Sequence, residues 1–171
     1  MDIDTIKLLG RYSSATTETM NGIIATLSDQ EWKKPFGGYY PSVQSICNHL
    51  YITDFNWLKR FGNIREFAYT KLALFAPSYT LDSRAFDSIE QYLEMRKELE
   101  AIFIKLSEEL MQLDFGKTFK WINFRGEDQA RNFGGIILHM FNHQTHHRGM
   151  ISLYLEFLGK PNDFSNLMFL V

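Results

Sequence analysis

Four long stretches of this 171-residue sequence place apolar residues at steps of three and four, the spacing of an amphipathic α-helix. The predicted helices cover residues 4–27, 42–62, 87–113 and 129–158. No repeated strand pattern accompanies them. Helices that each bury one face pack most simply against one another. We therefore predict an all-α fold, a four-helix bundle that forms a single domain over residues 1–171.

The ends of the predicted helices carry typical boundary residues. Ser42 is placed to act as the N-cap of the second helix, and Asp87 as the N-cap of the third. Gly62 ends the second helix, and the Gly-Lys-Pro run at 159–161 ends the fourth. These boundaries are predicted independently of the apolar periodicity.

The connections between the helices differ in length and character. Residues 28–40 form a loop, and residues 63–86 form a long irregular connection between the second and third helices. Residues 115–126 predict a short extended segment before the fourth helix. The last five residues, 167–171, are all apolar. We expect this tail to dock on the body of the protein or on a partner.

Charge and composition exclude several classes of protein. The 18 Lys and Arg residues nearly balance 20 Asp and Glu residues, which argues against a nucleic-acid-binding surface over the whole protein. The single cysteine, Cys47, rules out an intramolecular disulfide and suits a reducing compartment. The N-terminus shows no signal-peptide pattern, and no apolar run reaches the roughly 18 residues of a membrane span. We expect a cytoplasmic protein that binds neither nucleic acid nor membrane.

The histidines are the most informative residues of the sequence. His49 lies in the second predicted helix, and the other four occur within nine residues of the fourth. These four are His139, His143, His146 and His147. At about 100° per residue they span roughly 100° of one helix surface, with Thr145 and Arg148 on the opposite side. We expect the histidine face to point into the bundle.

Several imidazoles on a buried face are costly unless each ring nitrogen finds a partner. A divalent cation meets this need, because it binds one nitrogen of each ring. Two i,i+4 pairs could chelate it, His139 with His143 or His143 with His147, and His49 could add a third nitrogen. Three imidazoles leave open positions on Zn²⁺ or Ni²⁺, as in a catalytic site. The alternative is that these are ordinary hydrogen-bonded core histidines.

Three segments resemble one known family. Residues 142–149, Asn-His-Gln-Thr-His-His-Arg-Gly, resemble the fourth-helix motif of the DinB family of bacterial four-helix-bundle proteins. Residues 49–57, where a histidine precedes an aspartate and aromatic residues, resemble the second helix of that family. Residues 121–127 resemble the connection before its fourth helix. One difference is Met150, which stands where the family often has glutamine.

The resemblance implies a DinB/YfiT-like four-helix bundle whose divalent metal, zinc or nickel, is held by His49, His143 and His147. It thereby selects one of the two chelating pairs. Five other residues remain candidates for the surroundings of the site: His139, His146, Asp54, Tyr154 and Met150.

Two classes of function fit such a site. Several members of the wider superfamily resemble or are metal-dependent transferases and isomerases that use low-molecular-weight thiols such as bacillithiol or mycothiol, and others have no known activity. The resemblance therefore implies a thiol S-transferase, or a related hydrolase, acting on a small-molecule substrate. The alternative is a non-enzymatic metal-binding or interaction protein in which the metal staples the helices. In either case the resemblance and the apolar tail lead us to expect a homodimer.

Overall fold

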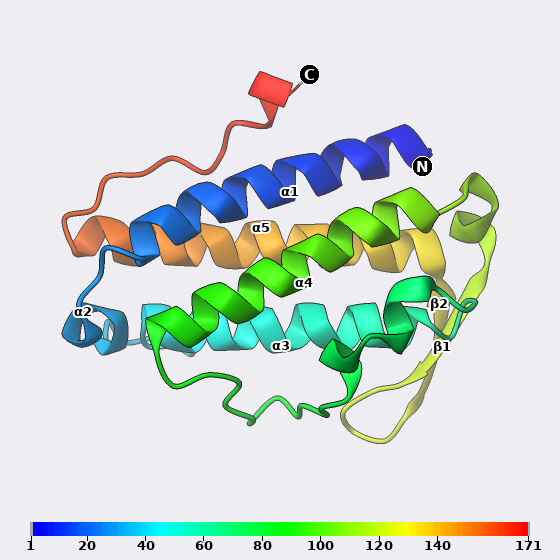
Figure 1. Ribbon diagram of the computed structural model, residues 1–171, viewed down its shortest axis with the longest axis horizontal. Coiled ribbons are helices and arrows are strands. Elements are labelled where there is room, and N and C mark those ends of the chain that lie inside the picture. Colours follow the sequence, from blue (N-terminus) through cyan, green and yellow to red (C-terminus); the bar gives the residue numbers. More distant parts are fainter. Residues whose placement is uncertain (1, 171) are drawn as a thin grey trace.

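The computed structural model describes residues 2–170 and is mostly helical, with one small two-stranded sheet. Its helices and strands, apart from short 3-10 helices, are α1 (Ile3–Ile24), α2 (Asp29–Lys33), α3 (Val43–Phe61), α4 (Ile89–Glu109), β1 (Thr118–Ile122), β2 (Asp128–Asn132) and α5 (Phe133–Phe157). The long helices α1, α3, α4 and α5 lie side by side (Figure 1). Both α1 and α3 contact α4 and α5, so the four helices share one apolar core. The predicted helical class is confirmed.

The predicted boundaries of the second helix are confirmed, and those of the third are not. Helix α3 begins after its N-cap Ser42 and ends before Gly62. Helix α4 starts one residue later than predicted, because Ser88 rather than Asp87 is its N-cap. The Ser88 side chain accepts a hydrogen bond from the backbone N–H of Gln91. A serine hydroxyl therefore satisfies one of the free N–H groups of the first turn.

The fourth predicted helix starts too early. Residues 128–132 form strand β2, which pairs antiparallel with β1 from Thr118↔Asn132 to Ile122↔Asp128. The extended segment predicted before this helix is thus one arm of a hairpin, whose turn contains Gly126 at φ 78°. Asn132 then caps α5 by accepting a hydrogen bond from the backbone N–H of Gly135.

The predicted loop at 28–40 contains a short helix that the apolar periodicity did not reveal. Helix α2 starts at a capping box in which Ser28 and Glu31 satisfy each other's backbone N–H groups. It buries Trp32 against Phe86 and Tyr92, with ring centroids 6.3 and 5.5 Å apart. This anchor fixes the start of the segment that leads into α3.

The long connection between α3 and α4 runs beside α3 (Figure 1). The Asn48 amide on α3 donates to the carbonyl of Ser83 and accepts from the backbone N–H of Ala85. The Asn56 amide, two turns further along, donates to the carbonyl of Tyr79. Side chains of α3 therefore hold an irregular segment that has no strand or α-helix of its own.

The C-terminal tail docks on α1 of the same chain. The Tyr12 hydroxyl donates to the carbonyl of Phe164 over 2.5 Å, and the Phe164 side chain is buried. A short 3-10 helix at Leu167–Leu170 also contacts α1. Within residues 2–170, no helix has the length and apolar character needed to cross a membrane.

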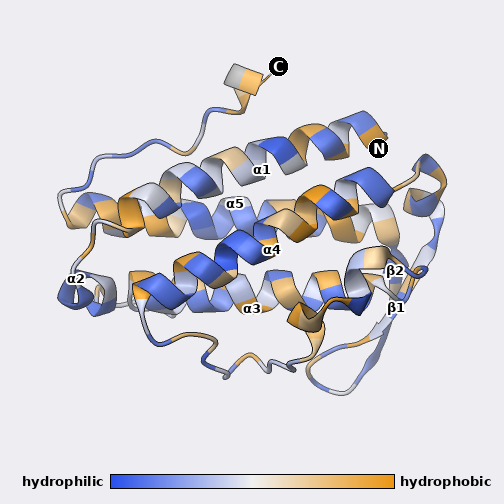
Figure 2. Cartoon of the chain, viewed as in Figure 1, coloured by the Kyte–Doolittle hydropathy of each residue, from blue (hydrophilic) through white to orange (hydrophobic). Residues whose placement is uncertain are grey.

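Helix α5 is buried on two sides because it packs against both α1 and α3. Figure 2 shows that hydrophilic residues interrupt the middle of this helix. The expectation that Arg148 points outward is wrong: Arg148 is 3% exposed, and its guanidinium donates to Ser13. Ser13 in turn donates to Gln144, whose amide donates to Asp54, and Asp54 pairs with Arg96 over 2.6 Å. We call these five residues the buried polar network.

Candidate metal centre

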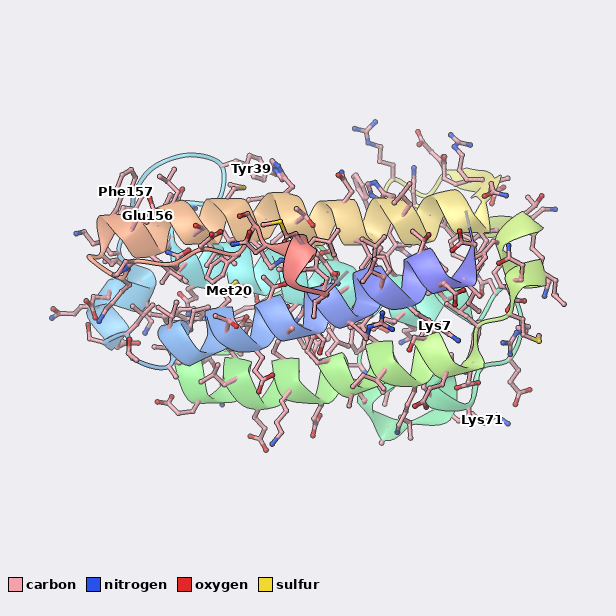
Figure 3. The ribbon with its side chains drawn as sticks, turned by 90° about the horizontal axis from the view of Figure 1, so that it is seen from above. Lys7, Met20, Tyr39, Lys71, Glu156 and Phe157 are labelled. Carbon is pink, nitrogen blue, oxygen red and sulfur yellow. The ribbon has the colours of Figure 1, made fainter. Side chains whose placement is uncertain are left out.

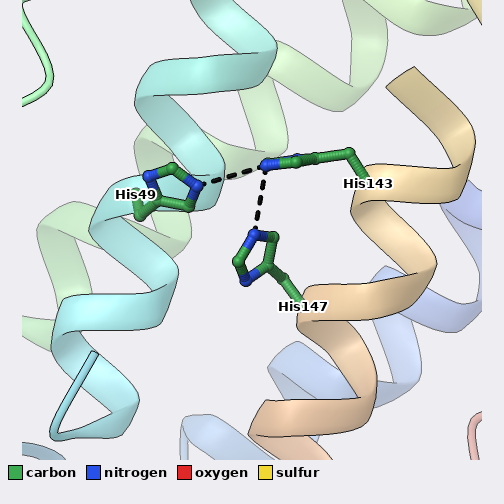
Figure 4. Close-up of side chains that lie close together, drawn as sticks. All are labelled: His49, His143 and His147. Carbon is green, nitrogen blue, oxygen red and sulfur yellow. Dashed lines mark hydrogen bonds between the residues drawn. The ribbon is translucent and has the colours of Figure 1, made fainter. Parts of the chain in front are cut away.

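Three histidine side chains from two helices converge between α3 and α5 (Figure 4). Nε2 of His143 lies 3.2 Å from Nε2 of His49 and 3.1 Å from Nε2 of His147. His143 and His147 are one turn apart on α5, and His49 faces them from α3. One ligand nitrogen from each ring can be chosen so that all three lie within 4.8 Å of one another. We call these residues the histidine triad.

The spacing of the three nitrogens suits a cation better than hydrogen bonds. Nε2 of His143 faces two other ring nitrogens, but a neutral imidazole nitrogen either donates one proton or offers one lone pair. It cannot make a good hydrogen bond to both neighbours. A metal ion accepts all three lone pairs. In a tetrahedral site with Zn–N bonds of 2.0–2.1 Å, ligand nitrogens lie about 3.3 Å apart, close to the 3.2 and 3.1 Å of the two pairs that include His143.

The triad is neutral at physiological pH. Burial, together with nearby imidazoles, lowers the pKa of His49 to about 4 and that of His143 to about 4. Burial and the neighbouring rings lower the pKa of His147 to about 3. Metal ligation requires deprotonated nitrogens, and these three residues offer them without having to release protons.

The low pKa values predict how the metal-free protein responds to acid. In the unfolded chain the imidazoles take up protons near pH 6.5, whereas the folded triad resists protonation until about pH 4. The unfolded state therefore binds more protons, and the free energy of unfolding should fall as the pH is lowered from 7 towards 5. Urea titrations of chelator-treated protein at pH 7 and 5.5 measure this loss. A His143→Gln/His147→Gln double variant should show a smaller loss, and an equal loss would contradict the prediction.

The other two clustered histidines lie together at one end of the predicted face. His139 and His146 are both exposed, so the expectation that all four histidines face the bundle interior is wrong for these two. The His139 ring lies 6.1 Å from that of His143, and the His146 ring lies 4.9 Å from that of His147. An arc of about 100° is wide enough for one end, with His139 and His146, to reach solvent while the other end, with His143 and His147, is covered.

Tyr40 is a site residue that the sequence analysis missed. Its hydroxyl lies 2.8 Å from Nδ1 of His49, and the two rings stack with centroids 4.3 Å apart. With Nε2 of His49 directed at the triad, Nδ1 carries the proton and donates to the Tyr40 oxygen. Such a partner fixes the ring orientation of a metal-ligating histidine. Tyr40 lies in a loop, where no periodicity could have revealed it.

Tyr154 of α5 holds the loop that carries Tyr40. Its hydroxyl lies 2.9 Å from the carbonyl oxygen of Gly37 and 3.0 Å from that of Tyr40, and its ring stacks on Phe36. Gly38 adopts φ 79°, and a Cβ there would lie 3.4 Å from the Tyr154 hydroxyl. Tyr154 therefore acts on the triad only through the loop.

Three further side chains, one in the loop and two among the predicted surroundings of the site, have other places in the fold. Figure 3 shows Tyr39, which is 88% exposed, at the outside of the same loop. Asp54 belongs to the buried polar network rather than to the triad's hydrogen-bond partners. Met150 is partly buried and packs against the apolar core.

Replacing Tyr40 by phenylalanine should weaken metal binding while leaving the ligands in place. Loss of the hydrogen bond to His49 is expected to reduce the affinity for zinc by about 10–100-fold. Competition with a chromophoric chelator measures the change. A Tyr39→Phe variant removes a neighbouring exposed hydroxyl and is the matched control. Equal affinities of the Tyr40 variant and the wild type would contradict the role assigned to Tyr40.

An open cleft of about 250 Å³ adjoins the triad. His49 and His143 form part of its wall, together with Trp57, Arg60 and Tyr79. A small molecule in this cleft would therefore contact two of the three candidate ligands. A metal held by the triad would face a space that can admit a substrate, unlike a closed structural site.

The fold and site together define a helical protein with a three-histidine centre between two long helices. The sequence model of the DinB family matches residues 3–168, and the chain belongs to the DinB family. It is similar to Protein DinB of Bacillus subtilis (strain 168), with 23% identity over 142 residues that cover 77% of this chain and 74% of that protein. The family resemblance stated from the sequence is confirmed.

Proposed function

We propose that the protein is a metal-dependent thiol S-transferase, or a related hydrolase, with the DinB/YfiT-like four-helix-bundle fold. His49, His143 and His147 hold a divalent ion, zinc or nickel. The observation that carries the proposal is the cleft beside the triad, because it leaves one side of the metal centre accessible to a small molecule. A low-molecular-weight thiol such as bacillithiol is the proposed cosubstrate.

When bound, the metal ion lowers the pKa of a thiol or water so that it reacts as a nucleophile at neutral pH. Residues around the centre support this chemistry by keeping the ligands neutral and oriented. The triad stays neutral because burial disfavours its protonated form, and Tyr40 orients His49. His139 lines the cleft, is exposed and lies beside His143, so it is placed to exchange a proton with a molecule bound there.

Two measurements test the proposal. Elemental analysis of the purified protein should find about one divalent metal per chain. The loaded protein should then conjugate bacillithiol, glutathione or coenzyme A to a generic aromatic electrophile faster than the free thiol reacts. His143→Ala should abolish the catalysed rate and His146→Ala should retain it. Absence of stoichiometric metal would overturn the proposal, as would turnover that persists in the His143 variant.

The second candidate is a non-enzymatic metal-binding protein in which the ion joins two helices. The observation that favours it is that the ligands come from α3 and α5, two helices that are far apart in the sequence. Tight metal binding without turnover of any thiol tested would support this candidate over the first.

A further inference from the structure

Arg60 is a half-buried cation without a counter-ion. It lies at the C-terminal end of α3 and lines the cleft that also contains His49 and His143. Among the described side chains, no Asp or Glu pairs with it and none lines the cleft. Its guanidinium lies over the ring of Trp57, with Cζ 5.6 Å from the ring centroid.

The electrostatics of the cleft favour an anion. Burial lowers the pKa of Arg60, but a guanidinium remains charged at any physiological pH. A partly desolvated cation with no partner gains most from an anionic ligand that binds it with two hydrogen bonds, such as a carboxylate. The walls beside it, formed by Trp57, Tyr79 and Phe124, suit an apolar or aromatic body.

The helix sets the distance between the cation and the triad. His49 and Arg60 are eleven positions apart on α3, or about 16 Å along the axis. Side chains on a helix lean towards its N-terminus, and the contact with Trp57, three positions earlier, shows that Arg60 does so. The guanidinium is therefore closer to the triad than its backbone is, and a ligand of about 8–12 Å could reach both.

We propose that Arg60 and Trp57 form a carboxylate-binding subsite, so that the thiol or substrate used at the triad carries a carboxylate at the far end of an apolar chain. This inference rests on the proposed function, which places the sulfur of the thiol at the triad. It adds the chemical class of the molecule and a residue that determines specificity.

The test compares matched acids and alcohols. The affinities of 8-mercaptooctanoate and 8-mercaptooctanol for the zinc-loaded protein are measured by calorimetry at pH 7.5. The wild type should bind the acid at least tenfold more tightly than the alcohol. Arg60→Gln should remove this preference while leaving the affinity for the alcohol unchanged, and Arg60→Lys should restore part of it. The shorter 3-mercaptopropionate should bind wild type and Arg60→Gln equally, because it cannot span the cleft.

A control variant separates local recognition from general attraction. Arg11 on α1 is exposed and lies outside the cleft, so Arg11→Gln makes the same charge change there and should keep the preference for the acid. Equal binding of acid and alcohol by the wild type would overturn the inference, as would a preference that survives in Arg60→Gln.

A metal-free comparison keeps this inference distinct from the proposed function. If the protein takes up no metal, the proposed function fails, but octanoate and octanol can still be compared through the tryptophan fluorescence of the cleft. An Arg60-dependent preference for octanoate would support the subsite in that case. No preference, or no binding of either probe, would overturn it.

Discussion

Replacing His143 by alanine is expected to abolish stoichiometric metal binding. Its Nε2 is the atom that lies within 3.2 Å of both other triad nitrogens, so its removal leaves His49 and His147 without the ligand between them. Loss of an outer hydrogen bond to a ligand already reduces metal affinity by about 10–100-fold, and loss of a ligand should cost more than 100-fold. Competition with a chelator of known affinity, followed by elemental analysis after dialysis, measures the effect.

The chain offers close controls for this experiment. His146→Ala and His139→Ala remove imidazoles of the same helix that are exposed and lie outside the triad. Both should retain one metal per chain with an affinity within a few-fold of the wild type. A His143 variant that still binds one metal tightly would show that another set of ligands is used. Far-ultraviolet circular dichroism establishes that each variant is folded.

Replacing Asp54 by alanine is expected to destabilise the protein by about 3–5 kcal/mol. Asp54 and Arg96 are 0% and 1% exposed at their side chains and lie 2.6 Å apart. Without the carboxylate, Arg96 keeps Glu100 as a partner, but Gln144 loses its acceptor and a buried positive charge is left poorly compensated. Urea unfolding followed by circular dichroism measures the loss of free energy.

An exposed ion pair provides the comparison. Asp29 and Lys33 lie 2.7 Å apart on the surface of α2, and Asp29→Ala should cost less than about 1 kcal/mol. Where Asp54→Ala does not fold well enough to titrate, Asp54→Asn keeps the shape of the side chain and should still lose more stability than the Asp29 variant. Similar losses at the two positions would contradict the importance of the buried polar network.

Apolar periodicity and cap residues were sufficient to predict the main helices. Ser42 and Gly62 bound α3 as expected, because each acts through local backbone chemistry that a sequence displays directly. Strand β2 was missed because its residues Asp-Gln-Ala-Arg-Asn carry no strand pattern. They are extended because they pair with β1, a contact between chain segments that local propensity does not describe.

The candidate site was predictable where its residues share a helix. His143 and His147 are one turn apart, so their proximity follows from helix geometry alone. The resemblance to the family was needed to prefer this pair and to add His49 from another helix. Tyr40 could not be predicted, because its position depends on how the loop after α2 folds back and on Tyr154, more than a hundred residues later.

The burial of Arg148 and Gln144 shows a limit of the helical wheel. The wheel assumes one buried face, but α5 lies between α1 and α3 and has two. Arg148, on its second face, was therefore assigned to solvent, and nothing was predicted for Gln144. Arg148 is hydrogen-bonded to Ser13 and Gln144 to Asp54, partners on other helices that could not be paired with them from the sequence.

The distance in sequence between His49 and His143 also affects the conformational entropy of the unfolded chain when both bind one metal ion. His49 and His143 are 94 residues apart, so an ion held by both closes a very large loop. For a disulfide that closes a loop of about 100 residues, the entropy removed from the unfolded chain corresponds to roughly 4.7 kcal/mol in the loop-closure model. A metal ion that stays bound to both histidines in the unfolded chain would lower the conformational entropy of that chain in the same way. A reactive centre built from these residues would then double as a long-range crosslink.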